Sequence, residues 1–440
     1  MMELSMIRGS MLIKSENMNC KRFLSKTAAL SAIMYLGMVS YSYAQEETVD
    51  WKARAAPTME APVLNTNPLP EYGYDRLDYG MTIGIERTPK GRIWACWVAG
   101  GDNEHAFFVL NRSDDNGVTW SDPKLVIDPQ NPELSETRRT IVGNLWTDPK
   151  GRMWLFFDQS MTYFDGRNGL WYTMTENPDD ENPIWSVPKR IWHGCALNKP
   201  TVLKDGTWVL GVSLWDRSKI KNDVFKDAFP ELDSLRMANV LVSTDEGKTW
   251  ERRGGVRFPT PQFDETQIVE RKDGTMWMTA RTRKEGLKQS ISYDQGRTWS
   301  TPEKYMPHIS SRHLLRRLQS GRLLLIKHGA LDEQTKFRSK MTAYLSEDEG
   351  KTWIGGLMID ERRGVSYPDG FQAPDGTIYI SYDRNRDWDG EILMACFTEG
   401  DVLSGAFQSD QARSRILISK PEGLDKLPAP SEVIHQAKKH

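Results

Sequence analysis

Short apolar segments rich in aromatic and β-branched residues recur along most of the chain, and turns rich in Gly and Asp separate them. Six of these segments run into a tight turn and continue as a second apolar segment, which is the pattern of a β-hairpin. The turn glycines are Gly91, Gly151, Gly206, Gly274, Gly321 and Gly376. Their spacings of 60, 55, 68, 47 and 55 residues each suit one four-stranded sheet. The pattern predicts an all-β protein, a six-bladed β-propeller with antiparallel blades.

A second repeat, S-x-D-x-G-x-T-W, lies between these hairpins. Its four copies are SDDNGVTW (113–120), STDEGKTW (243–250), SYDQGRTW (292–299) and SEDEGKTW (346–353). The Asp can accept hydrogen bonds from the following backbone, the Gly allows a positive φ, and the Trp packs into an apolar layer. We expect these turns to join the outer strands of a blade. A degenerate copy lies at 177–185, and the sixth blade has none, so we expect a strand from the N-terminal segment to close the ring.

The pattern divides the chain into four parts. Residues 1–44 have the features of a signal peptide, because Lys21, Arg22 and Lys26 precede an apolar run (28–39) and small residues at 42–44. The run is too short to span a bilayer, and residues 1–17 fit an over-long gene start. An extended lead-in (45–76), the propeller (77–420) and a tail (421–440) follow. The sequence therefore predicts export to the periplasm or outside the cell, and no membrane span.

Composition narrows the range of partners. The formal net charge is −2, with acids and bases interspersed, which argues against nucleic acid and anionic membranes. The four cysteines are widely spaced and the seven histidines are unpaired, so we predict neither a catalytic metal nor a cofactor. The long interval before residue 238 predicts a loop with a short helical piece in blade three. We expect a small, neutral or acidic partner, and the pattern leaves the oligomeric state open.

The hairpin register predicts which side chains surround the central channel. Positions nine residues before each turn glycine are Thr82, Val142, Leu197, Glu265, Arg312 and Tyr367. Positions seven residues after it are Val98, Asp158, Ser213, Arg281, His328 and Asp383. These two sets should meet at one mouth of the channel, and in blades four to six all of them are polar or ionisable. Glu265, Arg281 and Tyr367 favour a functional site there, whereas His328, Asp383 and Asp158 are more typical of structural positions.

The four S-x-D-x-G-x-T-W turns resemble the BNR or Asp-box repeats of the sialidase (neuraminidase) superfamily, and the resemblance covers residues 81–407. FDETQIVERKDGTMWMTAR, FRSKMTAYLSEDEGKTW and GVSYPDGFQAPDG are similar to segments that carry that family's site. The resemblance implies that Tyr367 is a nucleophile and Glu265 its base. It also implies that Arg281 and Arg338 bind a substrate carboxylate.

The first blade departs from the family. Its MTIGIERTPKGRIW has no arginine where the family has Arg-Ile-Pro, and we expect Arg312 to take that place, with Arg139 and Lys199 as alternatives. The following loop, VAGGDNEHAFF, offers Asp102 as the general acid that the resemblance implies. Glu104 and His105 are its rivals.

Three functions remain open. The resemblance implies a retaining exo-glycosidase that hydrolyses a terminal acidic sugar, sialic acid or a related ulosonic acid, from a glycan. A tyrosine nucleophile suits such a substrate because a carboxylate nucleophile would be repelled. The second is a lyase or altered glycosidase acting on uronate-containing polysaccharide, with Tyr or His (His105, His313 or His328) as the base. The third is a non-catalytic carbohydrate-binding propeller, against which the pairing of Glu265 with Tyr367 argues.

Overall fold

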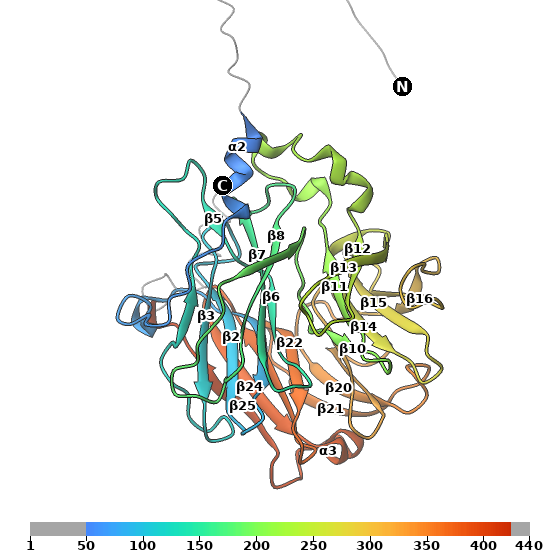
Figure 1. The fold of residues 1–440 in the computed structure, drawn as a ribbon. Helices are drawn as coiled ribbons and strands as arrows, with labels where there is room; N and C mark the ends of the chain where they lie inside the picture. Colours follow the sequence, from blue (N-terminus) through green and yellow to red (C-terminus); the bar gives the residue numbers. More distant parts are fainter. Residues whose placement is uncertain (1–49, 424–440) are drawn as a thin grey trace, which may run out of the picture. The chain divides into compact units, whose positions relative to one another are not determined.

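Six antiparallel sheets arranged as a six-bladed β-propeller make up the computed structural model, which describes residues 50–423 apart from the side chains of 262 and 264 (Figure 1). The predicted all-β fold is therefore confirmed. The predicted signal peptide (1–44) and most of the tail (421–440) lie outside the described residues. Within the described part, no helix is long and apolar enough to span a bilayer.

Each blade is built from one continuous stretch of chain, with its strands in sequence order. The first three blades contain β1 (Met81–Arg87), β2 (Ile93–Ala99), β3 (Phe107–Ser113) and β4 (Leu125–Ile127); β5 (Arg138–Arg139), β6 (Gly143–Thr147), β7 (Met153–Met161), β8 (Gly169–Thr175) and β9 (Lys189–Trp192); and β10 (Thr201–Val202), β11 (Trp208–Ser213), β12 (Ala238–Ser243) and β13 (Glu251–Val256). In the second blade, β5 and β6 both pair with β7.

The other three blades follow the same order. They contain β14 (Pro261–Glu270), β15 (Met276–Thr282), β16 (Leu287–Ser292) and β17 (Glu303–Met306); β18 (Leu314–Arg317), β19 (Leu323–His328), β20 (Met341–Ser346) and β21 (Ile354–Asp360); and β22 (Val365–Gln372), β23 (Ile378–Arg384), β24 (Glu391–Phe397) and β25 (Arg413–Ser419). A short helix, α3 (Glu399–Ser404), connects β24 to β25 and is capped by Thr398.

The six predicted hairpins all form, and they join β1 to β2, β6 to β7, β10 to β11, β14 to β15, β18 to β19 and β22 to β23. At Gly274, for example, φ is 85°, its N–H donates to the Arg271 carbonyl, and the Arg271 N–H donates to the Thr275 carbonyl. The other five turn glycines also have positive φ, between 82° and 106°. A side chain at these positions would be strained, so glycine fixes the turn and with it the register of both strands.

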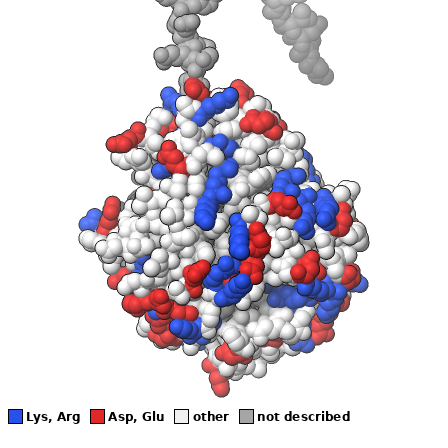
Figure 2. Space-filling model, viewed as in Figure 1, with Lys and Arg blue, Asp and Glu red and all other residues white. Residues whose placement is uncertain are grey.

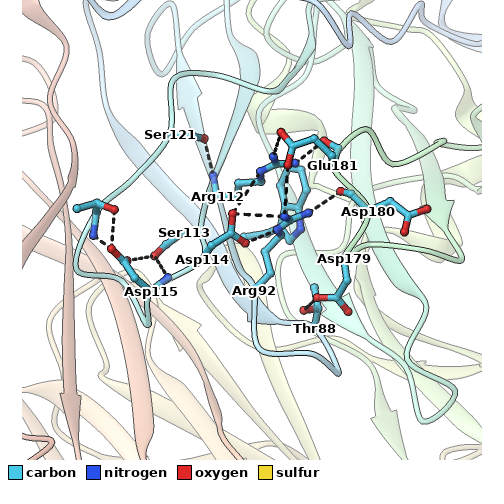
Figure 3. A network of polar contacts seen from close by, with 12 residues as sticks. Thr88, Arg92, Arg112, Ser113, Asp114, Asp115, Ser121, Asp179, Asp180 and Glu181 are labelled. Carbon is cyan, nitrogen blue, oxygen red and sulfur yellow. Dashed lines mark hydrogen bonds and ion pairs between the residues drawn. The ribbon is translucent and has the colours of Figure 1, made fainter.

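The four S-x-D-x-G-x-T-W turns connect the third and fourth strands of their blades, where the sequence placed them. Asp115 accepts hydrogen bonds from the backbone of Val118 and Thr119 and from the Thr119 hydroxyl, while Ser113 accepts from the Gly117 N–H. The Ser113 hydroxyl in turn donates to Asp115 (Figure 3). Equivalent hydrogen bonds from a Thr lower the pKa values of Asp245, Asp294 and Asp348 to about 2. These turns stabilise the outside of the blades.

Two expectations about the N-terminal segment are wrong. The sixth blade takes its fourth strand from β25, so no strand of the described N-terminal residues (50–80) closes the ring. The segment before β1 is not simply extended, because it contains α2 (Trp51–Ala55), η1 (Ala56–Met59) and η2 (Tyr74–Arg76). The Asp50 carboxylate accepts from the N–H groups of Lys52 and Ala53, and this cap initiates α2. Helices of so few residues are too short to produce a recognisable hydrophobic period.

The long insertion of blade three contains helical turns, as expected. They are η3 (Arg217–Lys219), η4 (Asp223–Phe225) and η5 (Pro230–Leu235), between β11 and β12. Phe225 and Leu232 are buried, and the ring of Phe229 lies 4.7 Å from that of Trp51 in α2. The insertion and the N-terminal helix therefore pack together, and they lie at the same end of the propeller (Figure 1).

The outer surface agrees with the near-neutral composition. Lys and Arg side chains alternate with Asp and Glu over the face shown in Figure 2, without a large area of one sign. The more unusual charges are those buried in the channel.

Candidate functional site

A tyrosine and a glutamate from two different blades meet at one mouth of the central channel. The Tyr367 hydroxyl donates to Glu265 Oε1 over 2.6 Å, although 102 residues separate them. Arg281 Nη1 donates to the same Glu265 oxygen over 2.6 Å and lies 3.1 Å from the Tyr367 hydroxyl. All three side chains are more than nine-tenths buried. The structure therefore brings together the three residues that the hairpin register predicted.

The backbone positions Tyr367 in an unusual way. Its φ is 54°, in a region that aromatic residues rarely occupy. The register of β22 against β23 shifts between Ser366 and Asp369, which places Tyr367 in a bulge. A similar irregularity in β14, between Pro261 and Thr266, contains Glu265. Bulges of this kind re-aim side chains and are frequent beside active sites.

The electrostatics keep the phenol protonated and the carboxylate ionised. Burial, reinforced by the Glu265 charge, raises the pKa of Tyr367. Burial also acts to raise the pKa of Glu265, but the Arg281 guanidinium and the Tyr367 hydrogen bond outweigh it and hold that pKa below its ordinary value. Glu265 Oε2 is buried and has no hydrogen-bond partner in the described part of the protein. The pair is thus arranged so that Glu265 can accept the phenol proton.

Three guanidinium groups surround Tyr367. Arg281 Nη2 and Arg338 Nη2 both donate to the Ser310 carbonyl, over 2.9 Å and 3.0 Å. Arg338 Nη1 and Arg386 Nη2 both donate to the Ser366 hydroxyl oxygen, over 3.1 Å and 2.8 Å. The Arg338 and Arg386 guanidinium carbons lie 5.5 Å and 4.0 Å from the Tyr367 ring centre. These shared acceptors hold the three cations close together.

The charges in this cluster do not cancel. Arg281 pairs with Glu265 at 2.6 Å, and Arg386 pairs with Asp383 at 2.9 Å. No carboxylate oxygen of residues 50–423 with described side chains lies within 4.0 Å of the Arg338 guanidinium nitrogens. Burial, and then the neighbouring Arg386 and Arg281, lower the pKa of Arg338. Three guanidiniums against two carboxylates leave one positive charge, which favours binding of an anion.

The remaining wall of the pocket is mostly apolar. The lining residues are Met81, Asp102, Ile141, Val142, Tyr163, Cys195, Leu197, Gly211, Ser213, Trp215, Phe263, Glu265, Thr266 and Tyr367. Five of these residues occupy positions that the hairpin register selected, namely Val142, Leu197, Ser213, Glu265 and Tyr367. The volume left between these side chains is small, about 40 Å³, so a sugar would require aromatic side chains of the wall to move.

Asp102 is the residue of its loop that lines this pocket. Its charge adds to the effect of burial in raising the pKa of Tyr163, which lines the pocket too. Asp102 and its rivals Glu104 and His105 are all exposed, but neither rival lines the pocket. Of the three candidates for the general acid, Asp102 is therefore the one that a bound ligand could contact.

Arg312 does not lie with the other two predicted arginines. It is fully buried deeper in the channel, where it donates to the Asn198 side chain, to the carbonyls of Ile83 and Leu197, and to Asp369. Its donors are thus used to link the first strands of several blades. The offset of nine residues placed it beside Glu265 and Tyr367, but its long side chain extends along the channel axis instead.

The two alternatives to Arg312 have structural partners as well. Lys199 Nζ lies between Glu86 and Asp369 at 3.1 Å and 3.0 Å. Arg139 forms a buried ion pair with Asp158, whose other oxygen accepts from the backbone of Ile141 and Val142. Asp158 and Asp383 are therefore each held in an ion pair, Asp158 with Arg139 and Asp383 with Arg386.

Arg386 is the site residue that sequence reasoning missed. It follows β23 in the turn before β24, outside the strand positions that the hairpin offsets sampled. Asp383 sits at a sampled position, and Arg386 lies three residues after it and ion-pairs with it. A search for cations just beyond the strand ends would have found it.

The histidines proposed as alternative bases lie elsewhere. His313 and His328 are buried, with His308 between them, at ring-centre distances of 6.2 Å and 5.5 Å from it. The His313 Nε2 contacts the Thr279 hydroxyl at 2.7 Å, and neither His313 nor His328 lines the pocket. Burial lowers the pKa of both to about 3. Among the described residues there is no group of His, Cys, Asp and Glu that could hold a metal ion.

The chain is similar to known proteins in sequence and in fold. The model of the BNR repeat-like domain family matches residues 91–380. A sialidase of Bacteroides fragilis (strain YCH46) is 26% identical over 316 residues, which are 64% of this chain and 55% of that protein. A sialidase of Paraclostridium sordellii is 24% identical over 235 residues, 48% of this chain and 54% of that protein. The chain spans about half the length of the curated relatives it matches.

Solved structures share the fold. The intramolecular trans-sialidase from Ruminococcus gnavus, in complex with oseltamivir carboxylate, superposes with a TM-score of 0.57 at 13% identity, covering 77% of this chain and 98% of that one. The Hadza microbial sialidase Hz136 superposes with a TM-score of 0.54 at 18% identity, covering 71% and 66%. At these identities the likeness concerns the fold alone.

Proposed function

The chain belongs to the BNR repeat-like domain family within the sialidase superfamily, and on that basis we propose that it is an exported, retaining exo-glycosidase that hydrolyses a terminal acidic sugar. The single observation that carries the proposal is the Tyr367 hydroxyl at 2.6 Å from Glu265 Oε1 inside a cluster of three guanidiniums. The sugar class is sialic acid or a related ulosonic acid. Export rests on the features of residues 1–44.

The substrate carboxylate binds to Arg338, assisted by Arg281 and Arg386. Arg338 has no carboxylate partner among the described side chains, so an incoming anion need not displace one. Arg386 takes the role for which Arg312 was considered, because it shares the Ser366 hydroxyl with Arg338. Charge-assisted bonds to guanidinium groups are short, and their fork geometry orients a planar carboxylate. This fixes the anomeric carbon relative to Tyr367.

In the first step, Glu265 accepts the proton of Tyr367 while the phenolic oxygen forms a bond to the anomeric carbon. The glycosidic bond breaks, and Asp102 donates a proton to the leaving oxygen. A neutral phenol avoids the repulsion that a carboxylate nucleophile would meet near the substrate's own carboxylate. Protonation of the leaving group is worth about 10²–10⁴-fold in rate.

In the second step, Asp102, now ionised, accepts a proton from water as the water oxygen attacks the anomeric carbon. The bond to Tyr367 breaks, and Glu265 returns the proton to the phenolate. Two displacements at one carbon retain its configuration. Because the pKa of Tyr367 is raised, its phenolate readily takes up a proton. Glu265 can return that proton because it stays within hydrogen-bond distance of the Tyr367 oxygen.

The proposal is tested with aryl glycosides of several sialic and ulosonic acids, with neutral β-galactoside and uronate glycosides as controls. We expect cleavage of an acidic-sugar glycoside, with the product's configuration retained by NMR. Labelling of Tyr367 by a fluorinated acidic-sugar fluoride, located by mass spectrometry, would identify the nucleophile. Release of an unsaturated product from uronate polysaccharide would instead support the lyase. The positions of His313 and His328 away from the pocket do not favour that reading.

A further inference from the structure

The opposite mouth of the channel, on the side of the hairpin glycines, contains another cation without a carboxylate partner. Two adjoining pockets lie there, of about 220 Å³ and 340 Å³, and Trp146, Arg316 and Arg317 line both. Their other walls come from the ends of first strands next to the hairpin turns, including Glu86, Gln372 and Lys204. These pockets are separate from the one that contains Tyr367, and they share no lining residue with it.

Ion pairs between the two mouths of the channel occupy the carboxylates nearest to Arg316. Arg312 pairs with Asp369 Oδ1 at 3.1 Å. Lys199 Nζ pairs with Asp369 Oδ2 at 3.0 Å and with Glu86 Oε2 at 3.1 Å. Lys199 also donates to the carbonyls of Ile85 and Leu145. The two cations Arg312 and Lys199 therefore share the carboxylates of Asp369 and Glu86, and neither carboxylate pairs with Arg316.

Arg316 is half-buried beyond these layers. Its Nη1 reaches only the carbonyls of Lys199 and Pro200, each at 3.5 Å, the outer limit of a hydrogen bond. No carboxylate oxygen among residues with described side chains lies within 4.0 Å of its nitrogens. Burial lowers the pKa of Arg316, and the more distant charges of Asp369 and Glu86 oppose this only in part.

The other charges at this mouth already have partners. Arg317 forms a two-point ion pair with Glu349, with contacts of 3.0 Å and 2.5 Å. Glu270 accepts from the backbone N–H of Lys204, and the Lys204 ammonium, which lines the same pocket, adds the opposite charge, so these two residues leave the balance of the mouth unchanged. The central group therefore holds three cations, Lys199, Arg312 and Arg316, against two carboxylates, Glu86 and Asp369, and one positive charge remains uncompensated.

We propose that the turn-side mouth is a second anion site, in which the Arg316 guanidinium binds a small oxyanion, a phosphate or a simple carboxylate, beside Trp146. A buried or half-buried cation is costly without a partner, and a planar guanidinium binds an oxyanion through two parallel N–H groups. Because Arg316 lies on β18 and Trp146 on β6, the bound anion links the first strands of opposite blades. The site stabilises the closed ring and is independent of the glycosidase proposal.

The test is thermal unfolding of the mature protein titrated with sodium phosphate, sodium acetate or sodium chloride, with ionic strength held constant by sodium gluconate. The titration is carried out in the Arg338→Gln background, since that variant removes the cation of the Tyr367 pocket that would bind the same anions. We expect a saturable rise in melting temperature with phosphate or acetate, because a ligand that binds only the folded state stabilises it. A response to chloride alone would contradict an oxyanion site.

The decisive variant is Arg316→Gln in the same background, with Arg297→Gln as the matched control, because Arg297 is an exposed arginine of a repeat turn. We expect Arg316→Gln to weaken phosphate binding at least tenfold by calorimetry, and Arg297→Gln to leave it unchanged. If Arg316→Gln does not fold, Arg316→Lys keeps the charge without the fork and should bind phosphate more weakly. Equal phosphate responses with and without the Arg316 guanidinium, or no response in either protein, would overturn the site.

Discussion

The two halves of the Tyr367 pocket differ in kind. Blades four to six supply Glu265 and Tyr367 to its lining, and the guanidinium groups of Arg281, Arg338 and Arg386 cluster against these two side chains. Blades one to three supply an apolar wall. That wall includes Met81, Ile141, Val142, Leu197 and Trp215. A sugar has a polar edge and an apolar face. We therefore infer that blades four to six supply the nucleophile and the carboxylate site, while blades one to three orient the ring and, through Asp102, protonate the leaving group. Each of the following changes tests this division.

The largest effect should follow from Tyr367→Phe. The substitution removes one hydroxyl and its hydrogen bond to Glu265, so the fold should persist, while kcat for the acidic-sugar glycoside should fall by about 10³-fold or more. Steady-state kinetics and the melting temperature of the same sample measure both. Turnover like that of the unchanged protein would remove Tyr367 from the mechanism and leave the ionic half with a binding role only.

Arg338→Gln should have the next largest effect. Loss of the guanidinium that lacks a carboxylate partner should lower kcat/KM for an acidic glycoside by about 2–4 kcal/mol, because a charge-assisted contact to the substrate is lost. Affinity for the free acidic sugar and for its methyl ester, measured by calorimetry, separates charge recognition from general packing. Similar losses for the acid and the ester would argue against a carboxylate site. Arg297→Gln serves as the matched control.

Arg281→Gln should shift the pH profile. The Arg281 guanidinium opposes the effect of burial on Glu265, so its removal should raise the pKa of Glu265 and move the acid limb of kcat/KM to higher pH. In the unchanged protein the pKa of Glu265 is depressed. The stability that it contributes is therefore fully present above the unfolded value of about 4.3 and is lost as the pH falls through the folded value. An acid limb that does not move in Arg281→Gln would contradict the assignment of Glu265 as base.

Trp215→Leu, in the apolar half, should have the smallest effect. We expect KM to rise about tenfold with kcat little changed, because the wall contacts the sugar equally before and during the reaction. Trp353→Leu is the matched control, since Trp353 packs at a repeat turn and donates to the Tyr305 hydroxyl. A fall in kcat comparable to that of Arg338→Gln would show that the apolar wall also contributes to the chemical step.

The blades and part of the Tyr367 pocket could be predicted from the pattern of turns and apolar segments. Gly274 and its counterparts fix the hairpins through their positive φ, and because side chains alternate in a strand, counting from those turns located Glu265, Arg281 and Tyr367 together. Resemblance to known repeats added Arg338 and Asp102. These features depend on local geometry that a short run of residues specifies.

The directions of the long arginine side chains, in contrast, depend on contacts between blades. Arg312 was predicted beside Tyr367 from its offset, yet it extends into the channel to Asp369. Arg386, outside the sampled positions, folds back over Tyr367 to Asp383. The pattern of the sequence likewise did not predict that β25 would be the fourth strand of the sixth blade. An arginine side chain has many rotamers, and its direction is set by the buried carboxylates that other blades supply, so residues distant in the chain determine it.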